Sequence, residues 1–257
     1  MNLHDITPVI AVYNEAPNLR RCLDRLTWAA TVIVVDSSST DETTAIAASY
    51  PNARVVQHVY SDHTTKWNYG VSQSPSRWIL SLDADYVLCA GFENELRDQP
   101  EAKADAWFAR FHYCVNGRPL RATLYPPRAV LFRKDRCTYL QDGHTQLLQI
   151  PGASAFLSTA IQHDDRKPLS RWFVSQDHCA KLEAAKLAAA SSDKLRWQDR
   201  ARRLLVVAPV LTFFYCLFAK GLILDGWRGW FYTWQRVLAE IMLSLRLLEK
   251  RCLPDDE

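Results

Sequence analysis

The sequence predicts an α/β fold, built on a mixed β-sheet and followed by a helical appendage. Over roughly the first 100 residues, short apolar runs alternate with helical patterns, which is typical of parallel strands joined by crossover helices. Aspartates directly follow two of those runs. The last third of the chain is helical in pattern and contains its most apolar stretch. With 257 residues, 48% of them apolar, the chain has room for one main domain and an appendage.

The first half of the sheet is expected to bind a ligand along one edge. We expect strands at residues 8–12, 31–35, 54–57 and 78–82, and helices at 17–26, 41–49 and 64–72. Pro17 suits a first helical turn, and Ser39 with Glu42 has the pattern of a capping box for the second helix. Right-handed crossovers then bring the carboxyl ends of the strands to a common edge.

The remainder of the chain divides into a second half of the sheet and a helical tail. Shorter strands are expected at 107–113 and 129–133, between loops rich in Gly and Pro. A helix is expected at 171–190. We therefore expect one domain over 1–168, with halves 1–100 and 101–168, and a helical tail over 169–257.

The tail has two features that favour contact with a membrane. Residues 204–219 (LLVVAPVLTFFYCLFA) are shorter than the ~20 that a spanning helix needs and include Pro209, which favours a shallow or re-entrant segment. Further on, apolar residues recur at helical spacing beside many aromatic and basic residues: Trp230, Trp234, Val237, Leu238, Ile241, Leu245 and Leu248. The alternative is a helical hairpin packed on the main domain or on a second subunit.

Composition excludes several classes of protein. The 31 basic residues nearly balance 28 acidic ones, so a net charge of +3 gives no argument for nucleic acid. The seven cysteines are scattered without a C-x-x-C pair, which indicates a reducing compartment. The first residues lack the basic and apolar regions of a signal peptide, so we expect a cytoplasmic protein.

Acidic residues mark the predicted ligand-binding edge. Asp36 follows Val-Ile-Val-Val and Asp83 follows Trp-Ile-Leu-Ser-Leu, which places both at carboxyl ends of strands, where open α/β sheets bind ligands. Asp85 lies two residues further along the same extended segment. Carboxylate oxygens suit Mg²⁺ or Mn²⁺, so this pair is a candidate metal site.

Three motifs in order resemble those of a known family. They are Val-Tyr-Asn-Glu (12–15), Val-Val-Asp-Ser-Ser-Ser-Thr-Asp (34–41) and Ser-Leu-Asp-Ala-Asp (81–85), and together they resemble family 2 glycosyltransferases with the GT-A fold, a Rossmann-like mixed sheet. The likeness covers residues 6 to about 90 and weakens to about 170. The second motif is similar to Asp-Ser-Gly-Ser-Thr-Asp of the subgroup acting on lipopolysaccharide core, with Ser38 in place of glycine.

The resemblance implies roles for the residues at these positions. Tyr13, Asn14 and Glu15 would line the nucleoside pocket. Asp36 would accept a hydrogen bond from uracil, unless it only caps a turn, and Ser38 would contact ribose.

Residues 66–70 (Lys-Trp-Asn-Tyr-Gly) are similar to a family motif on the helix before the Asp-x-Asp strand. There, Lys66 and Asn68 would contact the nucleotide, or the lysine would be solvated and Gly70 would pack the helix.

The resemblance also implies metal ligands and a base. Asp85 would bind the metal directly, Asp83 would contact ribose or metal, and His163, in a polar segment before the tail, would complete the metal shell. Inverting transfer needs a base for the acceptor hydroxyl. Asp142, with His144 in reserve, lies where the family places its catalytic acid at the start of an acceptor-side helix.

The sequence therefore predicts an inverting glycosyltransferase that uses a nucleotide-diphosphate sugar, such as a UDP-hexose, with a divalent metal. The expected acceptor is a glycolipid or lipid-linked saccharide of lipopolysaccharide-core type, reached at the cytoplasmic face of the inner membrane. A polyprenyl phosphate acceptor and a non-catalytic membrane scaffold are the alternatives. A dehydrogenase is excluded because no G-x-G-x-x-G follows the first strand, and a sugar nucleotidyltransferase is excluded for a similar reason. The motifs set neither the donor sugar nor the oligomeric state.

Overall fold

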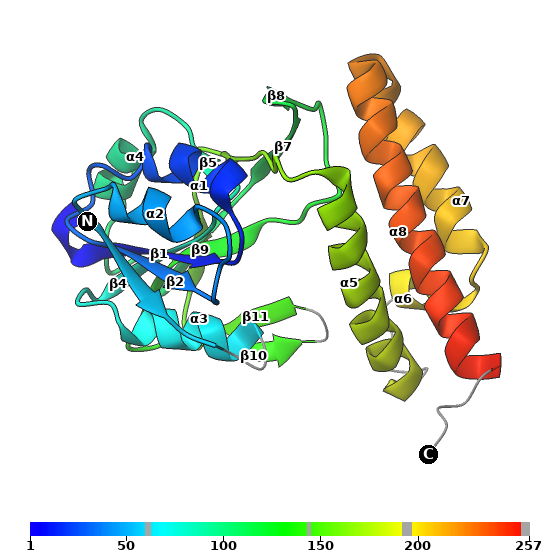
Figure 1. Cartoon of the computed structure of the whole chain (residues 1–257), viewed down its shortest axis with the longest axis horizontal. Coiled ribbons are helices and arrows are strands. Elements are labelled where there is room, and N and C mark those ends of the chain that lie inside the picture. Colours follow the sequence, from blue (N-terminus) through cyan, green and yellow to red (C-terminus); the bar gives the residue numbers. More distant parts are fainter. Residues whose placement is uncertain (60–62, 143–144, 192–196, 253–257) are drawn as a thin grey trace. The chain divides into compact units, whose positions relative to one another are not determined.

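The chain forms two compact units in a computed structural model that describes residues 1–59, 63–142, 145–191 and 197–252 (Figure 1). The sheet unit comprises Met1–Pro119 and Tyr125–Lys167. The helical unit comprises Leu120–Leu124 and Pro168–Glu257. Each unit is described by itself below.

A seven-stranded mixed sheet forms the centre of the sheet unit, in the order β12-β6-β9-β4-β1-β2-β3. Its strands are β1 (Ile6–Val12), β2 (Val32–Asp36), β3 (Ala53–Gln57), β4 (Trp78–Asp83), β6 (Ala106–Ala109), β9 (Arg128–Arg133) and β12 (Ser154–Phe156). Strand β1 runs parallel to β2 and β4, whereas β9 runs antiparallel to β4 and β6. The predicted α/β fold with a mixed sheet is therefore present.

Both faces of this sheet are covered by other elements. Successive side chains of a strand alternate between the two faces, so apolar side chains need covering on each. Ile10 on β1 packs into the core under α1 (Ala16–Leu23), α2 (Thr43–Ala48) and α4 (Phe92–Asp98). Its neighbour Val9 packs on the opposite face with Trp67 of α3 (His63–Ser72). The hairpin of β10 (Thr138–Asp142) and β11 (Thr145–Gln149) covers that second face with α3 (Figure 1). A short helical turn, η1 (Leu3–Asp5), precedes β1.

A smaller sheet brings a histidine beside the Asp-Ala-Asp segment. Its order is β5 (Tyr86–Leu88), β13 (Ile161–His163), β7 (Phe111–Val115) and β8 (Arg118–Pro119). In this sheet His163 is paired with Tyr86 on one side and with Tyr113 on the other. Since Tyr86 directly follows Asp85, the pairing places two distant parts of the chain together.

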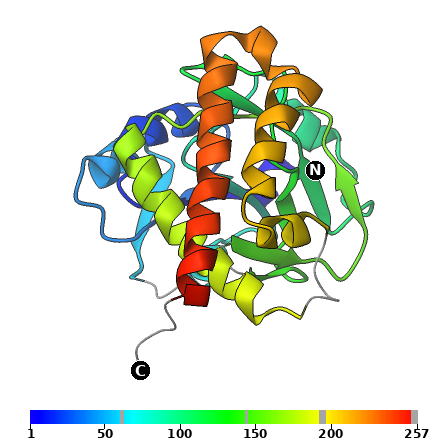
Figure 2. The same cartoon turned by 90° about the vertical axis from the view of Figure 1, so that its right-hand side faces the viewer.

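The helical unit is a bundle in which the longest helix lies between two others. Its elements are α5 (Leu169–Ala189), α6 (Trp197–Arg203), α7 (Val207–Phe214), the π-helical turn η3 (Tyr215–Ala219), η4 (Leu222–Asp225) and α8 (Trp227–Cys252). Helix α8 runs beside α5 and α7 (Figure 2). Leu187 of α5 packs against Leu243 and Leu247 of α8. Within the described part of the chain, the helices are too short or too polar for any of them to span a bilayer.

Three local predictions were wrong. The expected strand at 107–113 is divided into β6 and β7. The expected capping box does not form, because α2 begins after Glu42 and the Ser39 hydroxyl is bonded to Asp36 instead. Asp142 ends strand β10 of a hairpin and does not begin a helix.

Candidate functional site

The carboxyl ends of three parallel strands lie side by side in the sheet unit. Val12 at the end of β1 is in register with Asp36 at the end of β2. On the other side of β1, Ala11 is in register with Asp83 at the end of β4. The three polar motifs of the sequence are thus neighbours at one edge, as parallel strand pairing requires.

The turns after β1 and β2 are tied together by side chains. Asp36 is only 1% exposed and accepts a hydrogen bond from the Ser39 amide at 3.1 Å. The Ser39 hydroxyl in turn accepts one from the Asn14 amide at 2.8 Å, and the Asn14 side chain accepts one from the Thr40 amide at 2.7 Å. The side chains of Asp36 and Asn14 therefore stabilise the turns at this edge, and Asp36 acts as a turn cap.

Two of these turn residues have left-handed backbone conformations. Asn14 has φ 53° and Ser38 has φ 64°. Asparagine tolerates this region, but for serine it costs free energy that glycine would not. Ser38 therefore occupies a position where the backbone conformation favours glycine, which is the residue that the similar family motif has there. Beside this turn, Tyr13 is 48% exposed.

Lys66 and Asn68 on α3 have different surroundings. Lys66 is 3% exposed and its Nζ donates a hydrogen bond to the Val12 carbonyl at 2.8 Å. Burial lowers the pKa of Lys66 to about 8, against the attraction of the nearby carboxylates of Asp36, Asp83 and Glu15. The Asn68 amide instead bonds both the carbonyl and the amide of Tyr139 on β10, at 3.0 and 3.1 Å. Lys66 therefore lies at the strand-end site, whereas Asn68 fastens the hairpin.

Asp85 and His163 form a buried pair. His163 Nε2 lies 3.2 Å from Asp85 Oδ2, while Asp85 Oδ1 and His163 Nδ1 are buried without a hydrogen-bond partner among the described residues. Burial alone would raise the pKa of Asp85 and lower that of His163. The opposite charges outweigh burial, so the pKa of the carboxyl lies below and that of the imidazole above its usual value.

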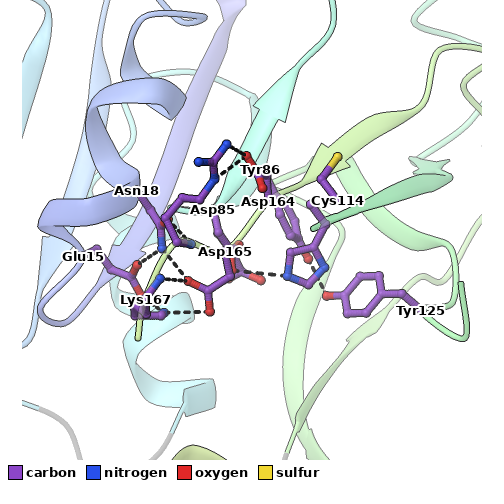
Figure 3. Close-up of polar contacts among 12 residues, drawn as sticks. Glu15, Asn18, Asp85, Tyr86, Cys114, Tyr125, Asp164, Asp165 and Lys167 are labelled. Carbon is purple, nitrogen blue, oxygen red and sulfur yellow. Dashed lines mark hydrogen bonds and ion pairs between the residues drawn. The ribbon is translucent and has the colours of Figure 1, made fainter. Parts of the chain in front are cut away.

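A network beside this pair was missed by sequence reasoning (Figure 3). Asn18 of α1 is completely buried, and its amide nitrogen donates to Glu15 at 2.9 Å and to Asp165 at 2.8 Å. Lys167 Nζ lies 2.6 Å from Glu15 Oε1. Burial lowers the pKa of Lys167, but the charges of Glu15, Asp85 and Asp165 outweigh it and raise the value.

The same network holds the segment that follows His163. Arg21 forms an ion pair with the buried carboxylate of Asp164 at 2.7 Å and donates to Asn18 Oδ1 at 2.7 Å. Arg166 also pairs with Asp164, at 2.8 Å. The only signals in the sequence were polar residues one turn apart on the first helix and the polar segment 162–167.

Asp83 faces a cavity of about 240 Å³ in the sheet unit. The cavity is lined by residues from the end of β4, the start of β9 and the β10–β11 hairpin, among them Ser81, Arg128 and Tyr139. Asp142 ends β10 in this hairpin, but its side chain and the whole of His144 lie outside the described residues.

The candidate metal ligands are only partly assembled. Asp85 and His163 are in contact, and Asp83 is two residues before Asp85. Across the described ranges, no group of three or more His, Cys, Asp or Glu side chains is arranged to hold a metal ion. The buried Asp85 Oδ1, which accepts no hydrogen bond from any described residue, is nevertheless the kind of hard oxygen atom that Mg²⁺ or Mn²⁺ binds.

Comparisons with solved structures show the fold. The chain is similar to S. aureus TarS in complex with UDP-GlcNAc, with 16% identity, 96% of this chain and 91% of that chain covered, and a TM-score of 0.52. It is also similar to the mannosyltransferase PcManGT from Pyrobaculum calidifontis in complex with GDP-Man and Mn²⁺, with 14% identity, coverage of 98% and 88%, and a TM-score of 0.52. The sheet unit therefore has a GT-A-like fold.

Comparisons with curated sequences point the same way. The chain is 29% identical over 87 residues to the lipopolysaccharide core biosynthesis glycosyltransferase LpsC of Rhizobium meliloti, covering 32% of each protein. It is 34% identical over 92 residues to an uncharacterized glycosyltransferase of Rickettsia bellii, covering 35% of this chain and 31% of that protein. The matches thus span about a third of these relatives' length.

A family profile described as Glycosyl transferase family 2 matches residues 7–138, just over half of the 257 residues. The matched range contains all three strand-end motifs and ends at the first residue of β10. The chain therefore belongs to glycosyl transferase family 2.

Proposed function

We propose that this protein transfers a sugar from a nucleotide-diphosphate sugar to a hydroxyl of a glycolipid or lipopolysaccharide-core type acceptor. The observation that supports this most is the meeting of Asp36, Asp83 and the Tyr13–Glu15 turn at the carboxyl edge of three paired strands. A nucleoside needs hydrogen-bond acceptors, and its diphosphate needs a cation. The acidic groups at this edge can serve both needs, because carboxylates accept hydrogen bonds and also bind cations. The complexes of similar folds with UDP-GlcNAc and with GDP-Man support a nucleotide-sugar donor.

In this proposal the nucleoside lies against the exposed ring of Tyr13, beside the turn that Asn14 and Asp36 hold. Ser38 is in the same turn and offers its hydroxyl to ribose. Glu15 is paired with Lys167, so its role in this structure is to hold the segment after His163. Lys66 contributes a positive charge beneath the strand ends.

Asp85 and His163 would hold a divalent ion, with Asp83 as a further contact to ribose or metal. They fit such an ion because Asp85 Oδ1 lacks a hydrogen-bond partner in the described structure and an imidazole nitrogen lies 3.2 Å from Asp85 Oδ2. When bound, Mg²⁺ or Mn²⁺ supplies positive charge that stabilises the departing diphosphate. The Mn²⁺ in the complex of PcManGT supports this assignment.

Inversion at the anomeric carbon requires a base on the face of the sugar opposite the diphosphate. Asp142 remains our candidate, with His144 in reserve, because the β10–β11 hairpin borders the cavity beside Asp83. The base would take the proton of the acceptor hydroxyl as the new bond forms.

A membrane acceptor is supported by the surface of the helical unit. Large apolar side chains of α7, η3, η4 and the start of α8 are exposed: Val207, Val210, Leu211, Phe214, Phe218, Leu224, Trp227, Trp230, Phe231 and Trp234. We call these residues the apolar hairpin surface. The Arg228 guanidinium lies 4.6 Å from the Trp227 ring centre and Lys220 Nζ lies 5.4 Å from the Tyr215 ring centre, so cations flank the aromatic residues as at a lipid headgroup layer.

The apolar residues of α8 extend beyond the predicted stripe. Within that stripe, Trp234 and Leu245 are 54% and 60% exposed, whereas Val237 is buried. Tyr232, Leu243 and Leu247 lie outside the stripe and are also buried in the bundle. Helix α8 is thus apolar on two sides. We propose that the exposed side contacts the cytoplasmic face of the membrane as a peripheral or re-entrant element.

The proposal is tested by a transfer assay. Purified protein is incubated with each of a set of nucleotide sugars, Mg²⁺ or Mn²⁺, and lipopolysaccharide-core or polyprenyl-phosphate acceptors in detergent. We expect metal-dependent product with a glycolipid acceptor. Product on polyprenyl phosphate alone would favour the alternative acceptor, and no product with any nucleotide sugar would favour a non-catalytic scaffold.

A further inference from the structure

The cavity beside Asp83 has a basic residue in its wall that the proposed reaction does not use. Arg128, the first residue of β9, lines this cavity together with Asp83, Tyr86 and Tyr139. Its backbone is paired with Ala109 of β6. The position of Arg128 is therefore fixed by the central sheet, and its side chain borders the space next to the proposed metal site.

The Arg128 guanidinium is held by an aromatic ring and not by a carboxylate. It lies 5.0 Å from the centre of the Tyr125 ring. Among the residues that the structure describes, no carboxylate forms an ion pair with it within 4.0 Å. The Tyr125 hydroxyl is 2.5 Å from that of Tyr86, so the supporting ring is itself fixed.

A partly buried guanidinium without an acidic partner calls for an anion. Burying a charge is costly unless it is paired, and the five donors of arginine match the geometry of carboxylate and phosphate groups. Other arginines of the sheet unit satisfy this requirement internally: Arg21 is paired with Asp164 at 2.7 Å, and Arg133 with Asp135 at 2.7 Å. Arg128 is different, because its side chain faces a cavity.

The size and walls of the cavity fit a single sugar ring. Its volume of about 240 Å³ is below the roughly 300–1,000 Å³ of sites that enclose drug-sized ligands, so it does not suit a whole nucleotide sugar. Trp67, Phe108 and Pro127 give apolar surface for the C–H groups of a ring. The Tyr139 hydroxyl and Ser81, bonded to each other at 2.8 Å, offer polar contacts for ring hydroxyls.

We propose that this cavity is the subsite for the sugar that adjoins the diphosphate, and that Arg128 recognises an anionic substituent on that ring, either a carboxylate or a phosphate. The inference rests on the proposed function, because Asp83 links the cavity to the metal and diphosphate site. Arg128 is a specificity-determining residue in this account. With a neutral hexose, Arg128 would keep only the longer-range attraction of Asp83 and would form no ion pair with the ligand.

The test compares ligands that differ at one position of the ring. Binding of UDP, UDP-glucose and UDP-glucuronic acid is measured by calorimetry with Mn²⁺, for the wild type and for Arg128→Gln. A second arm titrates glucose, glucuronate and glucose 6-phosphate into protein saturated with UDP and Mn²⁺, which distinguishes a carboxylate from a phosphate. Arg77→Gln is the matched control, because this exposed arginine precedes β4 at its opposite end.

We expect an anionic ring to bind at least about tenfold more tightly than its neutral counterpart. Arg128→Gln should reduce that preference to less than about twofold and leave binding of UDP itself unchanged, and Arg77→Gln should alter neither. Normal UDP binding without any preference for an anionic ring would overturn the inference and leave the proposed function standing. A weaker affinity of Arg128→Gln for UDP itself, without loss of ring discrimination, would assign Arg128 to the diphosphate and also overturn it. Absence of UDP binding in the wild type would overturn both proposals.

Discussion

Replacing Asn18 with alanine should destabilise the sheet unit far more than its small volume suggests. Asn18 is completely buried, and its side chain makes four hydrogen bonds. Two are donated to the carboxylates of Glu15 and Asp165, and one is accepted from the guanidinium of Arg21. The fourth is accepted from the Arg166 amide at 2.8 Å.

The size of the effect follows from the charges of these partners. A hydrogen bond to a charged group contributes about 1.5–3 kcal/mol and one between neutral groups about 1 kcal/mol. The charged partners keep other contacts, such as Glu15 with Lys167 and Arg21 with Asp164, so the losses do not add fully. We therefore expect Asn18→Ala to lower the free energy of unfolding by about 3 kcal/mol, against a total of about 5–15 kcal/mol.

Urea denaturation followed by tryptophan fluorescence measures this directly, and the midpoint should fall without a change in slope. Asn94→Ala is the control, because the Asn94 side chain on α4 accepts one exposed hydrogen bond from Arg97 at 3.0 Å; its loss should change stability by less than about 0.5 kcal/mol. A loss below about 1 kcal/mol for Asn18→Ala would refute the idea that this asparagine is the centre of the network.

Three further predictions concern the helix under the sheet, the base and the membrane. Gly70→Ala should cost about 1–3 kcal/mol in urea denaturation, because the new methyl group would lie 2.6 Å from Val35 Cγ2; an unchanged midpoint would contradict the packing argument. Asp142→Asn should lower kcat by about 10²–10⁴-fold in the transfer assay while the affinity for UDP stays the same; unchanged kcat would leave His144 as the base. The double variant Trp230→Ser with Trp234→Ser, folded by its melting curve, should sediment less with anionic vesicles, and full sedimentation would exclude the apolar hairpin surface as the membrane contact.

The sequence predicted the parts of the fold that depend on local pattern. Strands β1, β2 and β4 were expected within two residues of their bounds, because each is a mostly apolar run that is buried on both faces. Their parallel pairing then brings Asp36 and Asp83 to one edge without further information. The proximity of His163 to Asp85 was expected only from the family resemblance.

The parts that the sequence did not predict depend on distant contacts. Asn18 has no motif of its own, and its importance comes from a loop almost 150 positions away, where Asp165 and the Arg166 amide meet it. The failed capping box has a similar cause, since Ser39 bonds across to the turn after β1 instead of to its own helix. The hairpin at Asp142 is fixed by its packing on α3, where the Asn68 side chain bonds the backbone carbonyl and amide of Tyr139.

The central claim is that the strand ends, with Asp85 and His163, hold a divalent ion and a nucleotide diphosphate together. Calorimetric titration of UDP into the wild type and into Asp85→Asn, each with and without Mn²⁺, tests this most directly. We expect Mn²⁺ to tighten UDP binding by the wild type at least about tenfold, and Asp85→Asn, folded by its melting curve, to lose that gain. Equal UDP affinity with and without the ion, or an unaltered gain in Asp85→Asn, would contradict the account.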